Sequence, residues 1–152
     1  MIKFQNILFV LCCMLLTISV QAAGQRTDIH ADANDVQPLL PGMKAPAFDV
    51  LTVAGEPVRF NPDQMTKPLV LSFFRGGWCP YCNLHLAELR KAESELEAMG
   101  FDIWFISIDQ PEQLYTSLDQ PDIGYEILSD SKLDATRSFG LAFRVTDETV
   151  EK

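Results

Sequence analysis

The feature that most constrains this chain is an apolar run that leads into a pair of cysteines and then into a long helical pattern. The run is LVLSFF over 69–74, the cysteines are Cys79 and Cys82, and the helical pattern extends to Gly100. Apolar residues without polar alternation are typical of a strand buried on both faces of a parallel sheet. Because open α/β sheets place their chemistry at the carboxyl ends of such strands, we expect both sulfur atoms at that edge.

The residues after this strand indicate where the helix begins and which face it buries. Pro80 lacks an amide hydrogen and has a fixed φ, so it suits the first turn of a helix. Charged residues fill the positions between the apolar ones, and Gly100 is suited to end the helix. The predicted apolar face consists of Leu84, Ala87 or Leu89, Ala92, Leu96 and Met99.

The helix start favours a reactive thiol at Cys79. Unpaired amide groups and the helix dipole favour an anion there, and thiol pKa values in C-x-x-C sites fall from ~8.5 to roughly 3.5–7.5. Cys82 follows three residues later on the same helical face, within reach of a mixed disulfide formed at Cys79. We therefore predict Cys79 as the nucleophile and Cys82 as the resolving thiol.

Residues 1–22 have the composition of a cleaved secretory signal peptide. Lys3 is the only charge, and the apolar run over 7–20 is shorter than the ~20 residues of a membrane span. Small residues at Val20 and Ala22 suit a signal peptidase, and an uncleaved anchor is the alternative. We expect a periplasmic or otherwise exported protein, without stable membrane insertion once the signal is cleaved.

Charge and cysteine content limit the partners of the mature chain. The formal net charge is −9, and loss of Lys3 would make it one unit more acidic, which argues against nucleic acid and anionic membrane surfaces. Cys12 and Cys13 would leave with the signal, so the C-x-x-C pair would remain alone. In an oxidising compartment such a closely spaced pair is a dithiol/disulfide couple, and no cofactor is predicted for it.

The rest of the chain predicts one α/β domain over 41–152, preceded by a flexible leader over 23–40. The leader is polar and shows no apolar period. After an initial hairpin, strand-like and helix-like segments alternate along the domain. The predicted strands are 48–53, 58–60, 69–74, 101–108 and 125–128, with another beginning in 141–145, and the predicted helices are 80–99, 110–118 and one capped by 129–131.

Four features point to one known family. One is the segment 74–83, whose core Trp-Cys-Pro-Tyr-Cys over 78–82 is the most specific part, and the others lie at 41–48, at 107–109, and at 128–130 followed by 139–141. Together they resemble the AhpC/TSA (redoxin, peroxiredoxin-like) family on the thioredoxin fold. The resemblance implies a central, mostly parallel sheet with helices on both faces, and thiol-dependent reduction of peroxides or disulfides with electrons from a thioredoxin-like donor. The family's C-terminal hairpin and last helix have no counterpart after 139, so the domain is expected to be C-terminally incomplete.

The chain also departs from the patterns of its relatives. Peroxidatic sites of this family carry a proline and a threonine or serine ahead of the active cysteine, where this chain has Ser72 and Gly76. Phe73 replaces the buried acid of thioredoxin-type sites. Each replacement removes a group that manages protons at the sulfur. The family's arginine falls by register near Leu133, and the possible substitutes are Lys132, Arg75 and Arg137.

Three residues are expected to support Cys79. Trp78 would shield the sulfur, Pro80 would start the helix, and Arg75 would stabilise the thiolate by its charge. The alternatives are simple packing at the strand end for Trp78 and a surface position for Arg75. Asp109 reaches the same sheet edge, where a role as a helix cap is the stronger interpretation.

Other interpretations of the cysteine pair stay open. Cys79 and Cys82 could bind zinc together with His85 and His30. His85, however, is expected to be an exposed helix residue. Alternatively, the two cysteines could form an inert disulfide. Within the redox interpretation, the overall resemblance favours a peroxidase, whereas the missing donors favour a disulfide oxidoreductase. A truncated remnant with a binding or accessory role is the non-enzymatic alternative.

Overall fold

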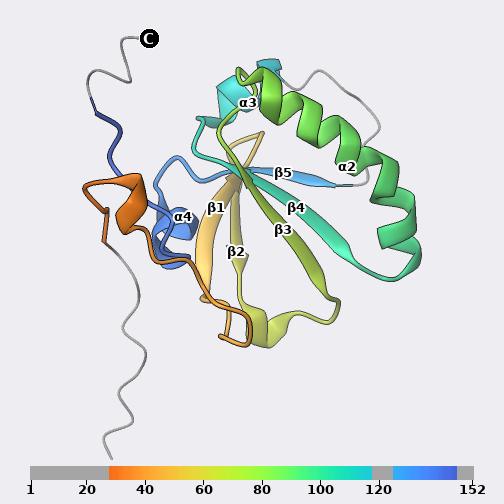
Figure 1. Ribbon diagram of the computed structural model, residues 1–152. Coiled ribbons are helices and arrows are strands. Elements are labelled where there is room, and N and C mark those ends of the chain that lie inside the picture. Colours follow the sequence, from red (N-terminus) through yellow and green to blue (C-terminus); the bar gives the residue numbers. More distant parts are fainter. Residues whose placement is uncertain (1–27, 118–124, 147–152) are drawn as a thin grey trace, which may run out of the picture.

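The computed structural model describes residues 28–117 and 125–146, which form a five-stranded sheet with helices on both faces (Figure 1). The strand order is β2-β1-β5-β4-β3. Strands β3, β4 and β5 are parallel, whereas β1 is antiparallel to β2 and β5, so the sheet is mixed. The strands are β1 (Phe48–Thr52), β2 (Pro57–Phe60), β3 (Leu69–Phe74), β4 (Asp102–Ser107) and β5 (Glu126–Ser129). The arrangement confirms an α/β, thioredoxin-like fold.

The N-terminal hairpin is confirmed. Its strands pair antiparallel, with Phe48 opposite Phe60 and Val50 opposite Val58. Gly55 adopts a φ of +83° in the turn, a backbone conformation that glycine adopts without steric cost. Pro57 is the first residue of β2, a position where its missing amide hydrogen costs no ladder hydrogen bond.

Strand β3 lies at an edge of the described sheet, and it packs on both faces as predicted. It pairs with β4 alone among the described residues, and its six side chains are all half-buried. The run is apolar because its side chains alternate between two hydrophobic clusters: Leu69, Leu71 and Phe73 pack against one, Val70 and Phe74 against the other. Two-sided packing, rather than a central place in the sheet, explains the unbroken apolar pattern.

Two hydrophobic clusters lie on opposite faces of the sheet. Helices α2 (Pro80–Ala98) and α3 (Pro111–Ser117) cover one face, and α4 (Asp134–Ser138) covers the other (Figure 1). The α2/α3 cluster contains Leu86, Ile103, Phe105, Leu114, Tyr125 and Ile127. The α4 cluster contains Phe48, Val50, Phe60, Ile106, Leu128 and Ala135. This is the layered packing that buries both faces of a sheet.

Helix α2 buries part of the predicted face, because Leu89 and Leu96 pack against the α2/α3 cluster. Leu86 is its buried residue, whereas Leu84 is 61% and Met99 58% exposed. The buried stripe follows Cys82, Leu86 and Leu89 at spacings of four and three residues. Gly100 ends the helix with a φ of +85°, as expected.

The segment 28–40, predicted as part of a flexible leader, is tied to the end of the described chain. The His30 N–H donates to the Ala142 carbonyl at 2.9 Å, and the Arg144 N–H donates to the His30 carbonyl at 2.9 Å. The strand expected within 141–145 is therefore a single bridge between Phe143 and His30. A polar sequence did not reveal this pairing, because backbone groups make it. Residues 1–22 lie outside the described residues, and their cleavage stays a prediction.

None of the helices within 28–117 and 125–146 combines the length and the apolar character needed to cross a membrane.

Candidate active site

The cysteine pair lies at the carboxyl edge of the parallel strands, as predicted. Strands β3 and β4 end side by side at Phe74 and Ser107. The chain leaves β3 through a short loop, and α2 begins at Pro80 with Cys79 as its N-cap residue. The Cys79 N–H donates to the Gly76 carbonyl at 3.2 Å, which closes the loop directly before the helix. The strand and the helix start therefore fix the position of Cys79.

The surroundings of Cys79 favour its thiolate. The side chain is only 3% exposed and makes no capping hydrogen bond to α2. The hydrogen bond from the Cys82 thiol and the backbone N–H of Cys82 lower the pKa of Cys79. The positive charge of Arg75 and the N–H of Tyr81 act in the same direction, against the opposing effect of burial. An anion at the start of α2 is thus stabilised by local donors and by a nearby cation.

The pKa of Cys82 is displaced in the opposite direction. Burial raises it, and the hydrogen bond and charge of Cys79 raise it further. Cys82 lies half-buried on the stripe of α2 that also carries Leu86, and both cysteines are thiols in this structure. Because the pKa of Cys79 is lowered and that of Cys82 is raised, Cys79 is suited to attack as a thiolate while Cys82 keeps its proton. The roles of nucleophile and resolving thiol stay predictions.

Asp109 anchors the loop that precedes Cys79, which corrects its interpretation as a helix cap. Its carboxylate accepts hydrogen bonds from the Gly77 N–H at 3.2 Å and from the Trp78 Nε1–H at 3.3 Å. The Asp109 backbone is itself fixed: its N–H donates to Ser107 Oγ, and its carbonyl accepts from Ser129 Oγ at 2.7 Å. Sequence reasoning placed Asp109 at the right edge but did not show which way the carboxylate points.

Trp78 and Arg75 form a stacked pair beside the cysteines. The Arg75 guanidinium lies over the Trp78 ring, with its central carbon 4.8 Å from the ring centroid. Trp78 is 61% exposed, and Gly76 and Gly77 beneath it are buried. A Cβ atom at Gly76 would collide with the Trp78 indole and the Asp109 carboxylate. Glycine is therefore required where the family pattern has a hydroxyl residue.

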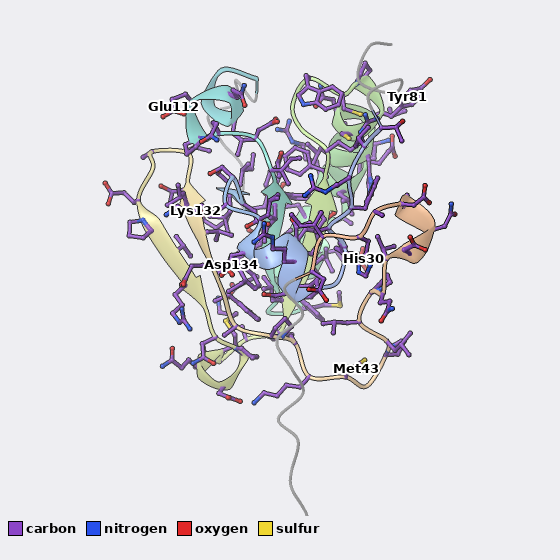
Figure 2. The ribbon with its side chains drawn as sticks, turned by 90° about the vertical axis from the view of Figure 1, so that its left-hand side faces the viewer. His30, Met43, Tyr81, Glu112, Lys132 and Asp134 are labelled. Atoms are coloured by element: carbon purple, nitrogen blue, oxygen red, sulfur yellow. The ribbon has the colours of Figure 1, made fainter. Side chains whose placement is uncertain are left out.

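Of the cations considered as substitutes for the family arginine, Arg75 is the one that acts on Cys79. Leu133 stands just before α4, and Figure 2 shows Lys132 and Tyr81 on opposite sides of the view, so Lys132 lies away from the cysteine loop. Arg137 is half-buried within α4.

The described residues also bear on the zinc interpretation. Within 28–117 and 125–146, no three His, Cys, Asp or Glu side chains are grouped as a metal ion would require. His85 is exposed on α2, as expected, and His30 pairs with Phe143 instead. Figure 2 shows His30 well apart from Tyr81, which is next to the cysteines in the chain. The residues proposed as ligands are therefore not brought together.

Comparison with known proteins places the chain in a family. The sequence pattern of the AhpC/TSA family matches residues 41–150. Peroxiredoxin Bcp of Escherichia coli is 30% identical over 106 residues, which cover 70% of this chain and 67% of that protein. A putative peroxiredoxin bcp of Haemophilus influenzae is 28% identical over 106 residues, or 70% of this chain and 68% of that one.

A solved structure extends the likeness to the fold. A putative thiol:disulfide interchange protein DsbE from Chlorobium tepidum superposes with a TM-score of 0.57 and 23% identity, covering 68% of this chain and 72% of that one. The family match over 41–150 and the structural similarity therefore agree. The chain belongs to the AhpC/TSA family of thioredoxin-fold thiol oxidoreductases.

Proposed function

We propose that this protein is an exported, thiol-dependent antioxidant oxidoreductase that works through a Cys79/Cys82 dithiol/disulfide couple. The observation that carries the proposal is the pair itself: two thiols at the start of α2 whose pKa values are displaced in opposite directions. The substrate is a peroxide or a disulfide. A thioredoxin-like dithiol protein returns the two electrons after each turnover.

In the peroxide route, the Cys79 thiolate attacks one oxygen of the peroxide. The O–O bond breaks, an alcohol or water leaves with a proton, and Cys79 becomes a sulfenic acid. The Cys82 thiol then attacks that sulfur, water leaves, and the Cys79–Cys82 disulfide forms. The names of the bacterial relatives support this route, because one is a peroxiredoxin and the other a putative peroxiredoxin.

The disulfide route uses the same two atoms. The Cys79 thiolate attacks a substrate disulfide and releases one thiolate, which leaves a mixed disulfide. Cys82 attacks the mixed disulfide, releases the second thiolate, and the Cys79–Cys82 disulfide again forms. Gly76 supports this alternative, because the family's peroxide-polarising hydroxyl is absent and the Trp78 indole and Asp109 carboxylate fill its place.

Rapid-mixing tryptophan fluorescence distinguishes the two routes. The reduced protein is mixed with hydrogen peroxide in one series and with a small disulfide in the other, and Cys79→Ser and Trp78→Phe serve as controls. Trp78 adjoins Cys79 in the chain, so its emission should follow oxidation of the sulfur, whereas Trp104 packs in the core. A fast, Cys79-dependent change with peroxide identifies a peroxidase. A fast change with the disulfide alone identifies a disulfide oxidoreductase, and silence in both series contradicts the proposal.

Export is tested separately from chemistry. The full chain is expressed in a Gram-negative host, the periplasmic and cytoplasmic fractions are separated, and the intact mass of the protein is measured. The proposal expects a periplasmic product that starts after Ala22. A cytoplasmic product that retains residues 1–22 contradicts it.

A further inference from the structure

The exposed side chain of Trp78 is held in one orientation by specific interactions rather than by packing. Its side chain is 61% exposed, so little packing holds it, yet the Arg75 guanidinium stacks on its ring. An exposed side chain keeps one orientation only if specific interactions offset its rotamer entropy. The hydrogen bond from Trp78 Nε1 to Asp109 is such an interaction, because it joins the ring to the end of a core strand.

We propose that Asp109 is a positioning residue for Cys79: it fixes the loop backbone and the Trp78 ring, and through that ring it holds Arg75 beside the sulfur. The proposal rests on the proposed function in one respect, that Cys79 is the attacking sulfur. Asp109 touches neither cysteine among the described contacts and acts through its neighbours.

The support for this chain of contacts is geometric. The two carboxylate oxygens are divided between the loop backbone at Gly77 and the indole of Trp78. Gly76 lies packed beneath both groups, since a Cβ there would collide with each of them. Asp109 is a firm anchor because hydroxyl groups from two neighbouring strands, Ser107 and Ser129, bind its backbone.

The direction in which the pKa of Cys79 moves when Asp109 is removed distinguishes a positioning role from a direct effect of its charge. Removing a negative charge near Cys79 would by itself favour the thiolate and lower the pKa of Cys79. Releasing Arg75 would have the opposite result, because the cation that favours the thiolate would move away. The charged or titratable groups that act on Cys79 in the structure are Arg75 and Cys82, so both must be controlled in the test.

The experiment follows alkylation of Cys79 by iodoacetamide across a pH series, with the modified peptide quantified by mass spectrometry. Asp109→Ala is compared with the unaltered chain, Asp109→Asn and Asp102→Asn, all with Cys82→Ser. Asp102→Asn removes an acid from the opposite end of the same strand. We expect Asp109→Ala to slow Cys79 alkylation at neutral pH about three- to tenfold and to move its midpoint to higher pH. Asp109→Asn, which keeps one acceptor oxygen, should have a smaller effect, and Asp102→Asn none.

The same measurement in an Arg75→Ala background tests the route of the effect. If Asp109 acts through Arg75, Asp109→Ala should change the midpoint little once Arg75 is gone. An unchanged midpoint in the first comparison, a shift to lower pH, or an equal shift in both backgrounds would each overturn the proposal. Circular dichroism of each variant checks that the fold is kept. Because alkylation requires no peroxide, disulfide or electron donor, the result is independent of whether the proposed redox activity is found.

Discussion

Two aspartates follow neighbouring parallel strands and serve different parts of the molecule. Asp109 comes after β4 and its carboxylate reaches away from its own helix, to Gly77 and Trp78. Asp130 comes after β5, is 1% exposed, and binds its own helix: it accepts from the Ala135 N–H, the Thr136 N–H and the Thr136 hydroxyl. The comparison separates a carboxylate that stabilises the fold from one that arranges the candidate site.

The two helix starts differ in the same way. The Ala135 and Thr136 N–H groups in the first turn of α4 donate to the Asp130 oxygens, although the N-cap position itself is occupied by Leu133. The start of α2 has Cys79 in the N-cap position and no side-chain capping bond, so nearby N–H groups act on sulfur instead. A helix start that lacks an oxygen cap loses stability, but it stabilises a thiolate.

Among the variants that test the contrast between Asp130 and Asp109, Asp130→Ala is expected to cause the largest loss of stability. It removes three accepted hydrogen bonds and leaves the Ala135 and Thr136 N–H groups without a partner beneath β1, so unfolding should require about 2–4 kcal/mol less free energy. Urea denaturation followed by circular dichroism measures the loss. In the folded Asp130→Ala protein, the midpoint of the pH profile of Cys79 alkylation should equal that of the unaltered protein. If Asp109→Ala cost as much stability as Asp130→Ala, the contrast would be wrong.

A smaller loss of stability is expected from Gly76→Ala. The added Cβ collides with the Trp78 indole and the Asp109 carboxylate, and such overpacking costs about 1–3 kcal/mol. The ring must also leave Asp109, so Trp78 emission should change in the folded protein. Gly55→Ala is the matched control, because a Cβ there meets nothing and only the positive φ is disfavoured. Equal behaviour of the two variants in fluorescence would argue against a packed loop.

The smallest expected effect is a change in the pKa of Cys79 when Cys82 is replaced. Cys82→Ala removes the thiol that donates to Cys79, which destabilises the thiolate and raises the pKa of Cys79. The midpoint of Cys79 alkylation should therefore move to higher pH. Cys82→Ser keeps a donor and should shift the midpoint less. A lower midpoint in Cys82→Ala than in Cys82→Ser would contradict the role given to this hydrogen bond.

The sequence predicted the framework of the site well because local rules determine it. An apolar run, two glycines and a proline placed Cys79 at a helix start on a sheet edge, and each of these elements forms within 69–98. The hairpin and the later strands were equally accessible, since their periodicity and turn residues are local signals.

The features that the sequence did not predict depend on contacts between segments that lie far apart in the chain. The carboxylate of Asp109 could cap a helix or bind the loop, and only the packing of β4 beside β3 decides for the loop. The burial of Leu86 on α2 was missed, because it depends on how the helix packs against the sheet rather than on residue spacing alone. The pairing of His30 with Phe143 was also missed, since backbone hydrogen bonds leave no trace in side-chain patterns.

The most direct test of the central claim is the mass of the protein after oxidation. Reduced protein receives one equivalent of hydrogen peroxide or of a small disulfide, is alkylated, and its peptides are analysed by mass spectrometry. The account predicts a product lighter by two hydrogens, with Cys79 and Cys82 joined and neither alkylated. A stable sulfenic or sulfinic acid at Cys79 with Cys82 still open to alkylation would contradict it, as would two thiols that remain unchanged by both oxidants.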